Sequence, residues 1–140
     1  MQAVWQSIIA GGPILLLHVA IALAMLALGV VVYVWMTPWE DLKLVREGNT
    51  AAGVALGGLI LGLGIPIAAC IPGAINHWDI LFWGLIALVL QIVTFKVVDL
   101  ILSGLPERIK AGEVGSAVVL TSTKLAVAVI VAAAISIPSA

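Results

Sequence analysis

Four apolar stretches dominate this chain of 140 residues, and each is close to the roughly 20 residues that a helix needs to cross a bilayer. They cover residues 12–36, 49–71, 79–104 and 113–137. Hydrophobic residues make up 64% of the chain and charged residues 9%, which leaves too little polar surface to cover a soluble domain. Lipid cannot satisfy free backbone groups, so helical spans are expected. The sequence therefore predicts an all-α membrane protein with four transmembrane helices in a single domain, residues 1–140.

Two segments of the chain repeat the same pattern. Residues 46–52 open the second apolar stretch and residues 110–116 open the fourth, and each follows a proline-bearing polar loop and another apolar stretch. The pattern indicates two helix-loop-helix repeats, residues 12–72 and 79–137. Because the first and third helices run in the same direction, the repeats are expected to be parallel, with a pseudo-two-fold axis along the membrane normal.

The positions of the cations predict the orientation in the membrane. The first and third loops carry cations, whereas the amino terminus, the second loop and the carboxyl terminus carry neither Lys nor Arg; the loop cations are Lys43, Arg46, Arg108 and Lys110. The positive-inside rule places these loops in the cytoplasm and both termini in the periplasm. Residues 1–10, which include Trp5, are expected to form a short interfacial helix. The formal net charge of −1 gives no reason to expect a nucleic-acid partner.

Small residues make the second helix the expected packing helix. Gly53 and Gly57 form one small-xxx-small pattern, and Gly58 and Gly62 form another. Helices in lipid associate through close backbone approach, which small residues permit. Since Gly57 and Gly58 point about 100° apart, two faces of the helix can be approached closely. We expect one face to pack inside the bundle and the other to form a subunit interface in a homo-oligomer.

Polar residues inside the third and fourth spans form the first candidate site. Gln91, Lys96 and Asp99 share one face of the third helix, and Lys124 lies near the middle of the fourth. A lone ammonium at that depth needs a partner or water, and Asp99 is the expected partner. Two interpretations are open. In the first, the Lys96 side chain extends to the inner membrane interface with Asp99 beside it, and Lys124 only fixes the register of the helices. In the second, the cluster lines a water-filled path or binds an anionic group.

The first cytoplasmic loop, residues 37–49, is the second candidate site. Asn49 can cap the second helix, and Glu47 places negative charge near its positive dipole end. The functional alternative is display to a cytoplasmic protein partner, with these contact residues: Trp39, Glu40, Asp41, Lys43 and Arg46. The sequence has no nucleophile elbow, phosphate loop, acidic pair or defined metal-ligand spacing, so we expect no enzyme activity, no metal and no cofactor.

The same loop, together with Ala51-Ala52 and Leu56-Gly57-Gly58 behind it, resembles the domain of unknown function 350 family, small uncharacterised bacterial inner-membrane proteins of the UPF0719 type. Residues 81–85 and 90–91 are similar to the third helix of that family, and residues 108–113 to its second loop. The resemblance implies a four-helix plasma-membrane protein without an assigned activity. It also implies an association with envelope-stress proteins through gene neighbourhood, which is not a mechanism.

These observations lead to two functional hypotheses. The first is a non-enzymatic scaffold or interaction component of a bacterial inner membrane, with a part in envelope-stress response suggested by the resemblance. The alternative is a small oligomeric ion or solute channel or transporter lined by the polar cluster, Gln91, Lys96, Asp99 and Lys124. A conduit should lose flux in Lys124→Met without losing its fold, whereas a scaffold should lose partner binding when Trp39 and Arg46 are changed.

Overall fold

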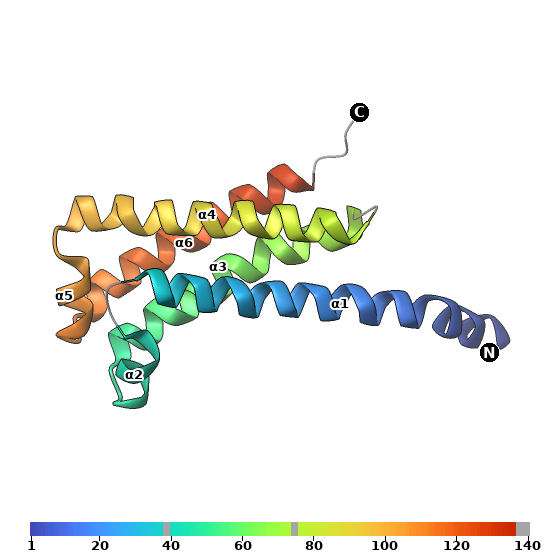
Figure 1. Ribbon diagram of the computed structural model, residues 1–140, viewed down its shortest axis with the longest axis horizontal. Helices are drawn as coiled ribbons and strands as arrows, with labels where there is room; N and C mark the ends of the chain where they lie inside the picture. Colours follow the sequence, from blue (N-terminus) through green and yellow to red (C-terminus); the bar gives the residue numbers. More distant parts are fainter. Residues whose placement is uncertain (38–39, 74–75, 137–140) are drawn as a thin grey trace.

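The computed structural model describes residues 1–37, 40–73 and 76–136, and its long elements are four helices (Figure 1). Helix α1 runs over Gln2–Met36, α3 over Thr50–Cys70, α4 over His77–Leu102 and α6 over Val114–Ile135. All four are long and apolar enough to cross a membrane, and the described residues contain no strand. The predicted all-α class with four spans is confirmed. The last three helices begin and end within about two residues of the predicted spans.

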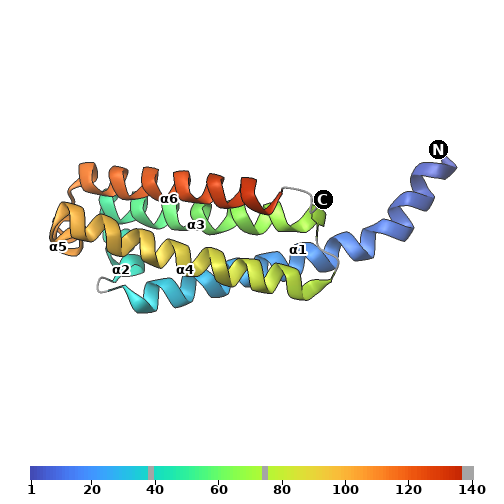
Figure 2. The ribbon, with the colours of Figure 1, turned by 90° about the horizontal axis from the view of Figure 1, so that it is seen from above.

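The first helix is longer than the predicted first span. Helix α1 is continuous for 35 residues and includes Pro13, so the separate helix expected over residues 1–10 is instead the first part of α1. A proline inside a helix removes one backbone hydrogen bond and bends the helix without having to end it. Figure 2 shows this bend, with the amino-terminal part of α1 turning away from the other helices.

The loops at one end of the bundle contain short helices. Helix α2 covers Asp41–Arg46 and α5 covers Leu105–Lys110, and both lie at the end opposite the amino terminus (Figure 1). A short 3-10 helix, η1, covers Ile71–Gly73 at the other end. The break before α5 falls at Ser103 and Gly104, which have φ angles of 52° and 74°, and not at Pro106. Pro106 lies in the first turn of α5, where its missing N–H costs no helical hydrogen bond.

Both short helices end in the same backbone turn. Gly48 follows α2 with φ 85°, and Gly112 follows α5 with φ 82°, a left-handed conformation that glycine adopts without steric cost. The next residue then donates from its backbone N–H to a carbonyl in the preceding helix, Asn49 to Leu44 at 2.9 Å and Glu113 to Arg108 at 3.0 Å. Each half of the chain thus contains a long helix, a six-residue helix and a helix of 21 or 22 residues. The duplication itself stays a prediction.

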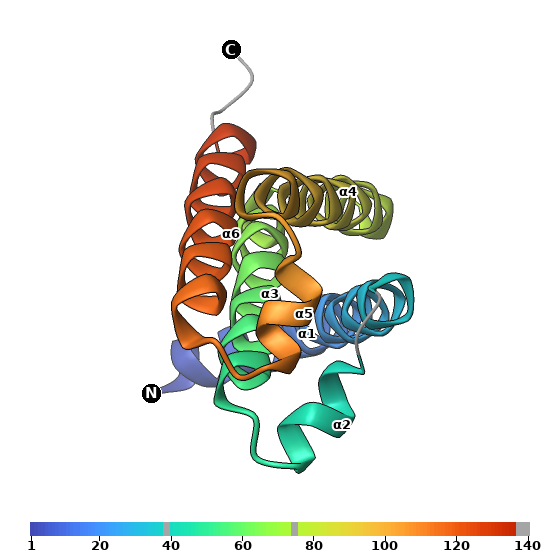
Figure 3. The same cartoon turned by 90° about the vertical axis from the view of Figure 1, so that its left-hand side faces the viewer.

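Helix α3 occupies the centre of the bundle, with α6, α4 and α1 around it (Figure 3). Its most extensive contact is with α6, where a Cβ added to Gly58 would lie 2.6 Å from the side chain of Thr121. The Thr121 hydroxyl donates to the Val54 carbonyl of α3 at 2.9 Å. Glycine therefore permits this close approach, and a larger residue at position 58 would force Thr121 or the helices to shift.

The two glycine pairs of α3 face different surroundings. A Cβ on Gly62 would lie 2.9 Å from Gln91 of α4, so Gly58 and Gly62 form the face that packs inside the bundle. A Cβ on Gly53 or Gly57 would meet nothing within 4 Å. That second face is open in the single chain, and its use as a subunit interface stays a prediction.

Candidate functional site

Lys124 is a buried cation near the middle of α6. Its side chain is 1% exposed, and it lies ten residues, about 15 Å, from the first residue of the helix. The Lys124 Nζ donates a hydrogen bond to the Tyr33 hydroxyl at 2.6 Å and lies 4.1 Å from the centre of the Tyr33 ring. The ring face and the hydroxyl together stabilise an ammonium that would be costly in hydrocarbon.

Tyr33 belongs to the buried face of α1, which also includes Ala22, Met25 and Gly29. These residues recur every three or four positions, as expected for one stripe of a helix. The Tyr33 ring packs edge-on against Phe95 of α4, with ring centroids 6.3 Å apart. Tyr33 therefore joins α1, α4 and α6. Tyr33 is the only tyrosine in the chain, but its local sequence does not mark it as a partner of Lys124.

Asp41 is the one acidic residue among the buried polar side chains of the described residues. It is the first residue of α2, is 2% exposed, and accepts a hydrogen bond from the Thr37 hydroxyl at 3.1 Å. Asp41 is therefore not one of the exposed loop residues that the sequence suggested. A buried carboxylate in the first turn of α2 anchors this short helix to the membrane-embedded part of the protein.

The expected pairing of Lys124 with Asp99 is wrong. Asp99 accepts a hydrogen bond from the backbone N–H of Leu105 at 2.9 Å, so its carboxylate holds the start of α5. Lys96 is exposed, and its Nζ lies 5.4 Å from the centre of the Phe95 ring. Asp99 contacts the start of α5 and Lys96 is exposed, so long-range packing brings neither side chain to Lys124.

Gln91 is the second buried polar side chain of the cluster. Its Nε2 donates to the Gly62 carbonyl at 3.0 Å and to the Lys124 carbonyl at 3.2 Å, so it bridges α4 to α3 and α6. Its Oε1 is the one buried side-chain polar atom without a hydrogen-bond partner in the described part of the chain. The structure thus brings together Gln91 and Lys124, with Tyr33 against the Lys124 side chain, and separates Lys96 and Asp99 from them.

Asn49 joins the two loop regions. Its side-chain oxygen accepts from the Ala52 N–H at 3.0 Å, which confirms the predicted cap of α3. Its Nδ2 donates to the carbonyls of Ile109 and Lys110 at 3.0 and 3.2 Å, which satisfies two of the free carbonyls at the end of α5. The Asn49 side chain therefore caps α3 in one half of the chain and forms hydrogen bonds with the end of α5 in the other half.

Glu113 occupies the position before α6 that Asn49 occupies before α3, and it makes a different contact. It pairs with Arg108, whose Nε and Nη2 donate to its two carboxylate oxygens at 2.7 and 2.5 Å. The Arg108 guanidinium holds the pKa of the Glu113 carboxyl below its ordinary value. Arg108 also donates to the Leu102 carbonyl at the end of α4 at 2.9 Å, so this pair joins α4, α5 and α6.

Two shallow hollows lie on the surface around α2. The larger has a volume of about 520 Å³ and is lined by residues of α2 and of the end of α1: Val34, Trp35, Thr37, Glu40, Leu42, Lys43 and Arg46. The smaller, of about 310 Å³, is lined by Glu40, Lys43, Leu44, Glu47 and Lys110. Three of the five predicted interaction residues, Glu40, Lys43 and Arg46, line these hollows, Asp41 is buried, and Trp39 lies outside the described residues.

These features describe a four-helix membrane bundle with a buried Tyr-Lys pair and short helices in its loops. The chain belongs to the family described as Domain of Unknown Function (DUF350), whose model matches residues 4–135. It is 36% identical over 89 residues to the UPF0719 inner membrane protein YjfL of Escherichia coli K12, covering 64% of this chain and 67% of that protein. The YjfL protein of Escherichia coli O157:H7 matches equally. No solved structure matches significantly.

Proposed function

We propose that this protein is a non-enzymatic scaffold of a bacterial inner membrane that binds a cytoplasmic protein through α2. The observation that carries the proposal is that α2 buries one side and exposes the other. Asp41 is buried and Leu44 packs on the core, whereas Leu42 is 55% exposed. We define the α2 face as Trp35, Glu40, Leu42, Lys43 and Arg46, the exposed residues that line the larger hollow.

Two features support the α2 face as a binding surface. Its apolar and charged groups are interleaved, with Trp35 87% exposed beside the exposed ion pair of Lys43 and Glu40 at 3.0 Å. Protein interfaces are typically rich in aromatic residues and Arg surrounded by polar groups. The buried Asp41 and its hydrogen bond with Thr37 attach α2 to the bundle, and a surface that is ordered before binding loses less entropy on binding.

The inner-membrane location rests on the four apolar helices and on the relatives that are named inner membrane proteins. The α2 face is cytoplasmic in the orientation that the loop cations predict. A part in envelope-stress response, which the family resemblance implied, is a prediction that any partner identified at α2 will test.

A photo-crosslinking amino acid at Leu42 tests the scaffold directly in cells. We expect a crosslink to another protein that is lost in Arg46→Gln, because Arg46 lies on the same face. Glu107→Gln is the matched control, since it also removes one exposed charge at the same end of the bundle but lies on α5 outside the α2 face. A crosslink pattern that Arg46→Gln and Glu107→Gln change equally would contradict the proposal.

The alternative is a small oligomeric channel or transporter, and one observation favours it. Lys124 and Gln91 place a cation and an unpartnered carbonyl oxygen inside the bundle, groups that a polar permeant could contact. Ionic conductance and solute flux in liposomes, compared between the wild-type protein and Lys124→Met at equal incorporation, separate the two functions. A flux that the substitution alters would overturn the scaffold, and its absence from a folded protein would support it.

A further inference from the structure

The first part of α1 extends beyond the rest of the bundle. At 1.5 Å per residue the 35 residues of α1 span about 52 Å, whereas α3 and α6, with 21 and 22 residues, span about 32 Å. The first buried residue of α1 is Ala22. Figures 1 and 2 show the preceding part of the helix projecting past the bundle at the end opposite α2 and α5. Among the residues that the structure describes, none buries the apolar side chains of this part.

The helix changes character at the bend. We call residues 2–11 the arm. In the arm, Val4, Trp5, Ile8 and Ile9 fall within an arc of about 140°, with Gln6 and Ser7 on the remaining sides. After the bend, residues 14–17 are Ile and Leu pointing in four directions about 100° apart. A helix that is apolar all round suits the interior of a membrane, whereas an amphipathic one suits its surface.

The bend itself favours the membrane surface. Because Pro13 has no N–H, the Ile9 carbonyl four residues earlier lacks its helical partner and needs water or another donor. Hydrocarbon supplies no donor, but the hydrated headgroup layer does. The arm carries no charged residue, and its Trp5 is 63% exposed, which suits the interface, where tryptophan side chains concentrate.

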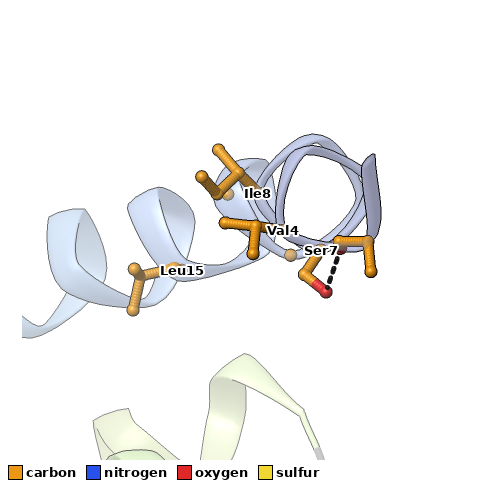
Figure 4. A pocket seen from close by; sticks show the side chains of 7 residues that line it. Val4, Ser7, Ile8 and Leu15 are labelled. Carbon is orange, nitrogen blue, oxygen red and sulfur yellow. Dashed lines mark hydrogen bonds between the residues drawn. The ribbon is translucent and has the colours of Figure 1, made fainter. Parts of the chain in front are cut away.

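A hollow of about 600 Å³ lies along one side of the bend (Figure 4). Val4, Ile8 and Leu15 line it, together with Gly11 and Gly12, which leave space because a Cβ on either would meet nothing within 4 Å. Its one hydroxyl, from Ser7, already donates to the Ala3 carbonyl at 3.0 Å. The lining that remains is apolar, and its chemistry matches a lipid acyl chain.

We propose that the arm lies flat in the headgroup layer of the leaflet opposite α2, with Val4, Trp5 and Ile8 towards the acyl chains and a lipid chain in the hollow at the bend. Lipid is the favoured occupant because the apolar arc is continuous with the lipid-facing surface of α1. The arm would then fix the depth and tilt of α1 from the far side of the membrane, independently of what α2 binds.

Fluorescent probes on single cysteines test this placement. In a Cys70→Ser background, an environment-sensitive probe is attached to Gln6→Cys or Ile8→Cys, which point about 160° apart, and the full chain is reconstituted in phosphatidylcholine vesicles. We expect a lipid that is spin-labelled near its headgroup to quench the fluorescence of the Ile8 probe. Iodide, added on both sides of the membrane, should quench the Gln6 probe at least about threefold more than the Ile8 probe. Leu16→Cys is the control for depth and should respond only to a spin label deep in the acyl region.

Three results would overturn the proposal. Equal quenching of both arm probes by iodide would place the arm in water. Quenching of both by the deep spin label alone would place it upright inside the membrane. If neither arm probe is quenched by the spin-labelled lipids or by iodide, and this protection increases with the protein-to-lipid ratio, the arm contacts a second copy of the chain. Because the probes lie on exposed positions before Ala22, the unchanged elution volume of each variant verifies that the bundle is folded.

Discussion

Lys124 of α6 and Tyr33 of α1 are joined by a hydrogen bond of 2.6 Å although 91 residues separate them along the chain. Both side chains are at most 2% exposed, so water does not replace either partner when the other is removed. The backbone N–H of Thr37 donates to the Tyr33 carbonyl at 3.0 Å, and the Thr37 hydroxyl donates to the buried Asp41 carboxylate at 3.1 Å. These contacts connect the centre of the membrane-spanning bundle to the loop that we propose as the binding surface.

Replacing Tyr33 with Phe should destabilise the protein because it leaves the Lys124 ammonium buried without its acceptor. The expected loss is about 1–3 kcal/mol of unfolding free energy, measured by denaturation in a fixed detergent. The double variant Tyr33→Phe/Lys124→Met should recover most of that loss, since it also removes the unpaired cation. Equal stability of Tyr33→Phe and the wild-type protein would show that the hydrogen bond contributes nothing.

Replacing Asp41 with Asn should loosen α2 while the four long helices stay folded. The amide has nearly the same shape as the carboxylate but carries no charge, so the hydrogen bond from the Thr37 hydroxyl becomes weaker. Hydrogen exchange of the α2 amides, followed by mass spectrometry, should accelerate by about tenfold. Glu40→Gln removes a carboxylate that is 73% exposed one position earlier, and it should leave the exchange unchanged. Similar acceleration in both variants would argue against a special role for Asp41.

Replacing Gly58 with Ala should weaken the contact between α3 and α6, because the added Cβ would lie 2.6 Å from Thr121. We expect about 1–3 kcal/mol of destabilisation, visible as a lower melting temperature. Gly57→Ala is the matched control: its Cβ meets nothing within 4 Å, so the higher helix propensity of Ala should leave the single chain as stable or more stable. A change in oligomer size in Gly57→Ala, measured by light scattering, would support a subunit interface on this face.

The ion pair of Arg108 and Glu113 should make the junction of α5 and α6 sensitive to acid. The pKa of Glu113 is lower in the folded protein than its ordinary value of 4.5. The folded state therefore favours the ionised carboxylate, and its stabilisation is fully present above pH 4.5 and is lost as the pH falls through the lowered pKa. Hydrogen exchange at the start of α6 should accelerate over that range, and Glu113→Gln should abolish the acid-dependent part. Acceleration that persists in Glu113→Gln would assign the effect to another group.

Much of the fold was predictable from local sequence signals. The number of spans follows from the apolar stretches, because a bilayer sets the length of a helix and lipid excludes other backbone structures. The cap at Asn49 and the presence of two small-residue faces on α3 were also predictable, since each depends on residue type and helical spacing. The parallel repeat, the position of both termini in the periplasm and the homo-oligomer stay predictions.

The need of Lys124 for a partner could be read from its position in the middle of an apolar span, because hydrocarbon does not solvate an ammonium. The identity of that partner, Tyr33 and not Asp99, could be read only from the packed helices. Helical spacing reports which residues share a face of one helix, whereas the side-by-side placement and rotation of α1, α4 and α6 depend on packing between residues far apart in the chain. For the same physical reason, spacing showed two glycine faces on α3, and only packing showed that the face of Gly58 and Gly62 is inside the bundle.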